Sequence, residues 1–197
     1  MSSMAAFPQN WSAEILKAPP LISPARRFTY PKQIAGEEDA LARGALQLIV
    51  KPATGEPFLA TCALGFTDPT MPTGVFACPN PQEICAAAGG YAYVIDTARP
   101  ELCTHLSLKP VVEIRASVEH ALLLFVGFHS IVAWGQTGIV WESARLSWEG
   151  IRITDIKVDS LNGFGWNLLT DKEENFSLNL TTGQHQGGGF HQPEKKK

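Results

Sequence analysis

Charged residues are scarce in this sequence, since Asp, Glu, Lys and Arg make up only 18% of it. The formal net charge is −3, and no stripe of lysine and arginine runs through the body of the chain. Nucleic-acid binding depends on such a stripe to neutralise phosphates, so no nucleic-acid partner is expected. The hydrophobic share of 45% is typical of a globular chain with a hydrophobic core, which excludes a largely disordered protein.

Long apolar runs and targeting signals are also missing. The first residues, MSSMAAFPQNW, contain neither a basic segment nor the apolar stretch of a secretory signal. The longest purely apolar run extends from Ala121 to Phe128. Even when it is continued to Gly135, it is shorter than the roughly 20 residues of a membrane-spanning helix. The sequence therefore predicts a cytoplasmic protein without a membrane span.

Cysteine is sparse and carries no metal-site spacing. The four cysteines are Cys62, Cys78, Cys85 and Cys103, and no C-x-x-C pair occurs among them. Zinc sites favour tighter spacing, and an unexported chain keeps its thiols reduced. We therefore expect four free thiols, with a Cys78–Cys85 disulfide and a metal site as alternatives.

No catalytic motif is present. The sequence lacks G-x-S-x-G, H-E-x-x-H, a Walker loop and a dinucleotide fingerprint. The glycine-rich GQHQGGGF follows no strand–helix junction, and the acidic residues Asp171, Glu173 and Glu174 lack the spacing of a calcium loop. No catalytic residue, metal or cofactor is therefore predicted, although carboxylates that meet only in space would escape this reading.

Helical periodicity is absent over any stretch of twelve residues, and helix is expected only in short pieces before residue 50. A helical turn at residues 12–17 and the segment from Glu37 to Leu48 come nearest. Many short apolar or alternating segments separated by Gly and Pro are typical of strands. The sequence predicts an all-β protein with antiparallel sheets in a sandwich or barrel.

The alternating segments predict a core and two local details. The core residues expected from them are Leu46, Leu48, Ile114, Val118, Leu123, Phe125, Ile151, Ile153, Phe176, Leu178 and Leu180. Ile151 and Ile153 have the opposite parity to Ile156 and Val158. This predicts a bulge at residues 154–155 that brings both pairs into the core, or two short strands with a tight turn between them. The segments GWNLLTD and NFSLNLT are expected to form a hairpin across DKEE.

The two halves of the chain resemble each other weakly. Each has an apolar segment ending in Gly-Phe, then Thr-Gly before an aromatic-containing segment, then a glycine before an alternating one. This similarity predicts two meander-like, propeller-blade-like units, at residues 44–97 and 111–182. Two such units cannot close a propeller, so they are expected to pack against each other or to pair between chains.

The domain organisation follows from proline and glycine. Five prolines between Pro8 and Pro31 predict an extended Pro-rich arm over residues 1–36. A single all-β domain is expected over residues 37–182, followed by a flexible Gly-rich tail over residues 183–197. The apolar side chains of the arm predict a protein partner or self-association through the arm.

Tryptophans supply the candidate contact residues. Four of the five lie in the second half of the chain, and at least one is expected to be exposed for a sugar ring or a protein partner. The candidates are Trp11, Trp134, Trp141, Trp148, Trp166 and His129.

These observations favour a non-enzymatic protein-binding or assembly module. The first alternative is recognition of a carbohydrate or another small ligand by the tryptophan-rich loops. The second is an enzyme without a recognisable motif.

Overall fold

The computed structural model describes residues 6–22, 24–31 and 41–190, and these residues form sixteen strands and no helix. The all-β prediction is therefore confirmed. The helical turn expected at residues 12–17 is wrong, because Trp11–Leu16 forms strand β1. Part of the segment from Glu37 to Leu48 lies outside the described residues, and its end belongs to a strand that begins at Ala45. No helix within the described residues has the length and apolar content needed to cross a membrane.

The strands form four sheets of four strands each. The first sheet has the order β1 (Trp11–Leu16), β3 (Ala45–Pro52), β4 (Phe58–Ala63) and β2 (Arg26–Tyr30). The second comprises β5 (Gly74–Ala77), β6 (Glu83–Ala88), β7 (Tyr91–Asp96) and β8 (Cys103–His105). The third comprises β9 (Glu113–Ser117), β10 (Leu122–Val126), β11 (Ile131–Gly135) and β12 (Gly138–Glu142). The fourth comprises β13 (Ile151–Ile156), β14 (Ser160–Asn167), β15 (Lys172–Asn179) and β16 (His185–Gly187).

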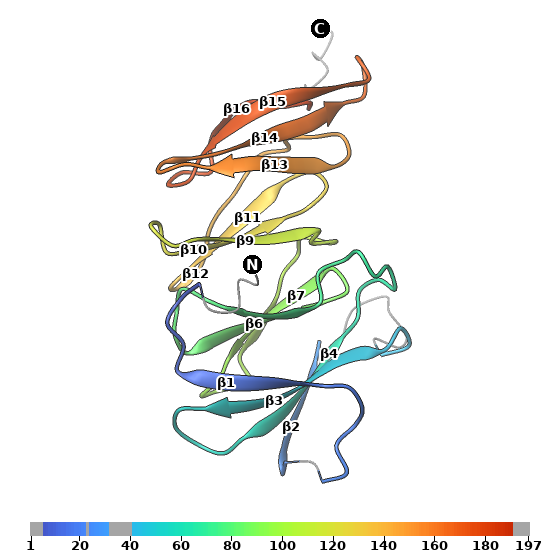
Figure 1. Ribbon diagram of the computed structural model, residues 1–197, viewed down its shortest axis with the longest axis vertical. Coiled ribbons are helices and arrows are strands. Elements are labelled where there is room, and N and C mark those ends of the chain that lie inside the picture. Colours follow the sequence, from blue (N-terminus) through green and yellow to red (C-terminus); the bar gives the residue numbers. More distant parts are fainter. Residues whose placement is uncertain (1–5, 23, 32–40, 191–197) are drawn as a thin grey trace, which may run out of the picture.

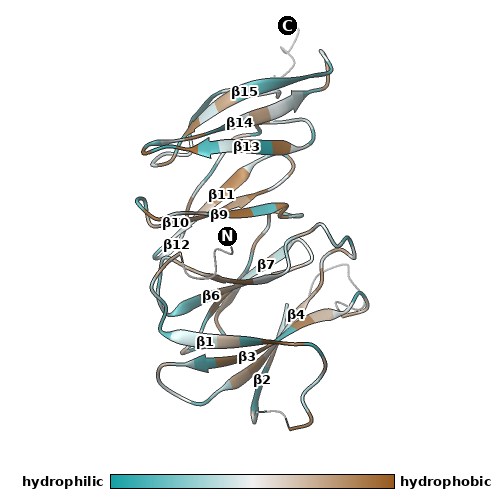
Figure 2. Cartoon of the chain, in the orientation of Figure 1, coloured by the Kyte–Doolittle hydropathy of each residue, from teal (hydrophilic) through white to brown (hydrophobic). Residues whose placement is uncertain are grey.

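The four sheets are stacked face to face in chain order, as in a sandwich with two extra layers (Figure 1). Strands of the second and third sheets, such as β7 and β10, are buried at nearly every position. The two faces of β10 serve different cores, because Leu123 and Phe125 pack toward the first two sheets while Leu122 and Leu124 pack toward the fourth. Strand β11 of the third sheet is one of the brown, apolar strands in Figure 2.

The structural repeat is the four-stranded sheet. The second, third and fourth sheets are simple antiparallel meanders, whereas the two segments of the expected repeat each extend over two sheets. The motifs that suggested the repeat also occupy different places. Gly65-Phe66 precedes the crossing from the first sheet to the second, whereas Gly127-Phe128 lies inside the third sheet, between β10 and β11.

Much of the expected Pro-rich arm is part of the first sheet. Strand β1 pairs antiparallel with β3, and β2 pairs parallel with β4, so the two strands form opposite edges of this sheet. Trp11 and Tyr30 are buried, and the Tyr30 hydroxyl donates to the main-chain oxygen of Pro100. Prolines lie before, between and after the strands, where they remove no ladder hydrogen bond.

The expected Gly-rich tail is also packed, as far as the structure describes it. Strand β16 pairs with β15, and the N–H of Gly189 donates to the main-chain oxygen of Leu146 at 2.8 Å. A Cβ atom on Gly165 would lie 2.3 Å from the oxygen of Leu146, and one on Gly189 would lie 2.3 Å from the main chain of Trp166. These glycines are required because two stretches of main chain touch where any side chain would collide.

The local details of the fourth sheet match the sequence in part. The pairing of β13 with β14 shifts register between Ile153 and Asp155, which confirms the predicted bulge. Val158 is not brought into the core, because β13 ends at Ile156 and Val158 is 66% exposed. The predicted hairpin exists as β14 and β15, but its turn is residues 168–171 rather than DKEE. The turn begins earlier in the chain than predicted, directly after Asn167, whose side-chain oxygen accepts the N–H of Leu169 at 2.8 Å.

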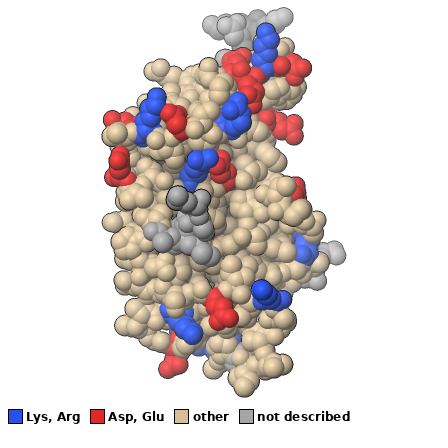
Figure 3. Space-filling model, viewed as in Figure 1, with Lys and Arg blue, Asp and Glu red and all other residues tan. Residues whose placement is uncertain are grey.

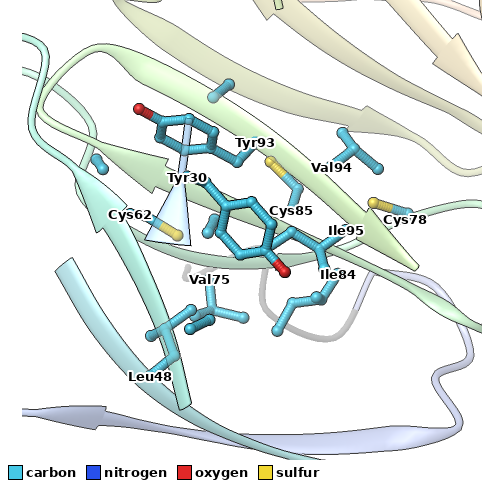
Figure 4. Close-up of a cluster of buried hydrophobic side chains, with 14 of the residues drawn as sticks. Tyr30, Leu48, Cys62, Val75, Cys78, Ile84, Cys85, Tyr93, Val94 and Ile95 are labelled. Carbon is cyan, nitrogen blue, oxygen red and sulfur yellow. The ribbon is translucent and has the colours of Figure 1, made fainter. Parts of the chain in front are cut away.

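The predicted core residues are buried with two exceptions. Ile114 is half-buried, and Val118 is 62% exposed because β9 ends at Ser117 and Val118 begins the turn. Tyr30, Tyr93 and Ile95 lie between the first and second sheets, whereas Cys85 lies on the other face of the second sheet (Figure 4). All four cysteines are free, which confirms that prediction, and burial raises their pKa values, to about 12 for Cys103.

Substitution of Phe176 by alanine tests the packing of the fourth sheet. The side chain is buried in the second core, so the loss should lower the free energy of unfolding by about 3–5 kcal/mol. The neighbouring Asn175→Ala is the matched control, because Asn175 is exposed on the opposite face of the same strand. Chemical denaturation checks both. An unchanged midpoint for Phe176→Ala would show that this strand does not contribute to the core.

Candidate functional site

Trp11 and Trp134 converge on Glu83, at the start of β6. The indole N–H of Trp11 donates to the main-chain oxygen of Glu83 at 2.9 Å, and that of Trp134 donates to its carboxylate at 2.8 Å. Both rings are buried. These two candidates therefore connect the first and third sheets to the second, and they offer no contact surface.

Glu83 is the one charged group in this connection. It is partly buried, and its carboxylate faces Trp134 while Asp96 lies opposite it on β7. Burial raises the pKa of Glu83, while hydrogen bonds from Trp134 and Asn80 act in the opposite direction. The net effect is that folding favours the protonated carboxyl.

Trp141 also has a structural role. Its ring is buried, and its indole N–H donates to the main-chain oxygen of Leu180 at 2.7 Å. Gly183 lies directly on the ring, where a Cβ atom would approach it to 2.8 Å. Trp141 therefore fastens the third sheet to the end of β15.

Trp148 and His129 form a second pair of candidates that lie near each other, and Arg145 lies between them. The guanidinium of Arg145 is 5.0 Å from the centre of the Trp148 ring and 4.7 Å from that of Phe190. It donates to the main-chain oxygens of Ser147 and Trp148, each at 3.0 Å, and lies 3.3 Å from Nδ1 of His129. We call Arg145, Trp148, Phe190 and His129 the arginine–aromatic cluster.

The arginine–aromatic cluster holds the last described residues against the fourth sheet. Phe190 follows the close-packed glycines, and its ring centre lies 4.9 Å from that of Trp148. Nε and Nη2 of the guanidinium donate to main-chain oxygens. The buried indole N–H of Trp148 has no partner among the described residues. We call the packing of Phe190 against Arg145 and Trp148 the clasp.

Trp166 stands apart from the other tryptophans. It is half-buried on the outer face of the fourth sheet, and its indole N–H donates to the carboxylate of Asp171 at 3.2 Å. The six candidates thus do not form one site. Three are buried connectors, two belong to the arginine–aromatic cluster, and Trp166 remains at the surface.

A Ser–His–Asp arrangement bears on the enzyme alternative. Ser117 Oγ lies 3.3 Å from Nδ1 of His120, and Nε2 of His120 lies 3.8 Å from Asp159. A nucleophile must be reachable and its orienting carboxylate sheltered. Here Ser117 is buried and the Asp159 side chain is 80% exposed, which is the opposite of what this mechanism requires. The described residues also contain no group of three potential metal ligands.

The most exposed large apolar side chains belong to the loop between β1 and β2. Leu21 is 105% exposed and Ile22 is 91% exposed, and Pro19, Pro20 and Pro24 flank them. We call Leu21 and Ile22 the apolar tip. Sequence reasoning counted both residues as apolar members of the arm but missed them as a site. The only signal in the sequence was two adjacent aliphatic residues between Pro20 and Pro24.

The base of this loop is fixed to the first sheet. The guanidinium of Arg27 donates to the main-chain oxygen of Pro24 at 3.3 Å, and that of Arg26 donates to the oxygen of Glu56 at 3.4 Å. Phe28 packs edge-on against Phe58 with ring centres 5.5 Å apart. The apolar tip therefore projects from an anchored base.

Comparison with solved structures finds only weak similarity of fold. No family model matches the chain, and no curated protein matches it. A solved structure described as "AfRom2 CNH domain" aligns with a TM-score of 0.37 and 12% sequence identity. The alignment covers 69% of this chain and 44% of that chain, so this chain spans less than half of its neighbour. Similarity at this level carries no argument about function.

Removing the guanidinium of Arg145 should release the clasp. Arg145→Ala leaves two main-chain oxygens without their charged donor and separates Phe190 from Trp148, so the free energy of unfolding should fall by about 1–3 kcal/mol. Arg152→Ala is the control, because Arg152 lies over the Phe164 ring in an exposed position and should leave stability nearly unchanged. Hydrogen exchange should accelerate at residues 185–190 in Arg145→Ala alone. Equal effects of both substitutions would contradict the clasp.

Glu83 should make stability depend on pH in the acid range. The pKa of Glu83 in the folded state lies above the usual 4.5, because burial favours the protonated carboxyl. The protonated carboxyl therefore contributes to the free energy of unfolding below pH 4.5, and this contribution is lost as the pH rises through the folded-state pKa. Glu83→Gln keeps an acceptor for Trp134 but cannot ionise, and it should be more stable than the parent protein at neutral pH. Urea denaturation from acid to neutral pH checks this. Parallel profiles for parent and variant would show that the carboxyl is not perturbed.

Proposed function

We propose that this chain is a non-enzymatic protein-binding module that inserts the apolar tip into a partner protein. The observation that carries the proposal is the nearly complete exposure of Leu21 and Ile22 on an anchored loop. Exposing two adjacent aliphatic side chains has no benefit for the isolated fold, since each would gain about 1.5–3 kcal/mol from burial. A pocket on a partner would provide that burial.

The flanking prolines also support insertion of the apolar tip into a partner protein. Proline restricts the unbound loop, so less backbone entropy is lost when a partner orders it. Lys17, Arg26 and Arg27 lie at the base of the loop, and they favour a pocket whose rim carries acidic residues. A second copy of the chain would be the partner if the module self-associates. We also propose that the protein acts in the cytoplasm, as expected from the sequence.

The experiment compares the apolar tip with a matched pair of exposed leucines. Leu168 and Leu169 form an exposed turn at the other end of the molecule without flanking prolines, so Leu168→Ser with Leu169→Ser is the control. A photo-reactive residue at position 21 should give a covalent adduct with one defined protein, and the same residue at position 169 should not. Leu21→Ser with Ile22→Ser should weaken binding of that protein by about tenfold or more, which corresponds to about 1.4 kcal/mol.

Two results would contradict the proposal. One is the absence of any specific adduct at position 21 in the parent chain. The other is equal retention of the captured protein by the tip variant and the turn variant. Light scattering distinguishes self-association, because then the captured protein is a second copy and the tip variant is smaller in solution. Substitution is preferable to deletion of residues 1–30, which would remove β1 and β2 from the first sheet.

A further inference from the structure

The outer face of the fourth sheet is a polar surface at the opposite end of the stack from the apolar tip (Figure 1). Along β15 the side chains of Phe176 and Leu178 are buried, whereas those of Asn175, Ser177 and Asn179 alternate with them and are exposed. Asparagine and serine are not strand-favouring residues. Their repeated use on one face therefore has no explanation in strand stability.

A groove of about 540 Å³ crosses this face where β14 begins and β15 ends. All of its lining residues are polar, and six of them come from three neighbouring strands and the turn before β16: Ser160, Ser177, Asn179, Gln184, His185 and Gln186. The register places Ser160 opposite Asn179 and Ser177 opposite Gln186. Because these residues sit on or beside paired strands, their positions are set before any ligand arrives.

The groove offers hydrogen-bonding groups that the fold does not use. Within the part of the chain that the structure describes, the side chains of Ser177, Gln184 and Gln186 form no hydrogen bond to protein. The side-chain oxygen of Asn179 accepts the N–H groups of Thr181 and Thr182, which leaves its NH2 group as a donor. Donors and acceptors are thus available side by side.

The charges that line the groove argue against an anionic ligand. No lysine or arginine lines it, and its one carboxylate, Asp159, would repel a phosphate. Charged side chains on the visible surface are more frequent toward this end of the molecule (Figure 3). Arg152 and Glu173 of the fourth sheet pair with each other and do not line the groove. Burial lowers the pKa of His185, so its imidazole is neutral near pH 7 and has both a donor and an acceptor.

No hydrophobic or aromatic residue lines the groove, which argues against a protein partner here, since the centre of a protein interface is rich in such residues. A neutral ligand with many hydroxyl groups matches amide and hydroxyl side chains instead. Trp166 lies on the same face of β14, six positions from Ser160, or about 20 Å along the strand. An aromatic ring in this row can pack against the apolar face of a sugar.

We infer that the polar groove between Ser160, Asn179 and Gln186 binds a neutral oligosaccharide. The hydroxyl groups of the saccharide would exchange hydrogen bonds with Ser177, Asn179 and Gln186, and a longer chain would extend along β14 toward Trp166. This site is independent of the apolar tip, so either inference can fail without the other.

The test uses the full chain, labelled with ¹⁵N, and four neutral hexasaccharides of glucose or N-acetylglucosamine: maltohexaose, cellohexaose, laminarihexaose and chitohexaose. At least one should shift the side-chain amide signals of Asn179 and Gln186 in a saturable way. Ser177→Ala with Gln186→Ala should weaken that binding by about tenfold, because two hydrogen bonds are lost. Ser12→Ala with Gln47→Ala removes the same residue types from the outer face of the first sheet and should leave binding unchanged.

Four results would overturn the inference, and three of them concern the saccharides and glycerol. These are no saturable shift with any hexasaccharide, equal binding by the groove variant and its control, and an equal response to glycerol at the same hydroxyl concentration. A thermal melt identifies a groove variant that has not folded, and the single, exposed Gln186→Ala then replaces it. Saturable binding of an anionic oligonucleotide at the same signals, with no saccharide response, would also refute it.

Discussion

Burial of both faces of the two middle sheets is the constraint on which this structure depends. Strands β7 and β10 are apolar at nearly every position, so each middle sheet must have another sheet on either side. The first and fourth sheets meet that need, and their own inner faces are buried in return. The stacking order in Figure 1 follows from this requirement.

The connections between layers are made largely by tryptophan indoles and by glycine. Trp11, Trp134 and Trp141 each donate an indole N–H to a group on another sheet, which satisfies the polar end of a ring that is otherwise buried. At the fourth sheet, Gly165 and Gly189 let two stretches of main chain meet, and Arg145 then covers Phe190. The tryptophans that suggest a binding site in the sequence therefore serve mainly as connectors.

The two ends of the stack differ in chemistry. Near the first sheet, two aliphatic side chains project between prolines. On the fourth sheet, amide and hydroxyl side chains line a groove without cationic residues. Terminal layers of stacked folds need a polar outer face, which accounts for the presence of polar residues there. The need for a polar outer face does not explain why unpaired amide groups line a groove. The groove therefore supports a ligand at this end.

Local pattern by itself determined the fold class, most of the core and the bulge near Asp155. Side-chain alternation has a period of two in any strand, so residues such as Leu178 and Leu180 are assigned to the interior without knowledge of the fold. The bulge follows from the same parity argument. The spacing of the four cysteines also favoured free thiols, and all four are free.

Only the tertiary structure decided which surfaces are open. The proline-rich segment forms β1 and β2 because a hairpin elsewhere in the chain, β3–β4, offers two free edges, and nothing in the local sequence reports those edges. The glycine-rich segment is packed because Leu146 and Trp166 leave no space for a side chain. Exposure of Leu21 and the grouping of Ser177 with Gln186 likewise depend on contacts between residues far apart in sequence, which periodicity cannot specify.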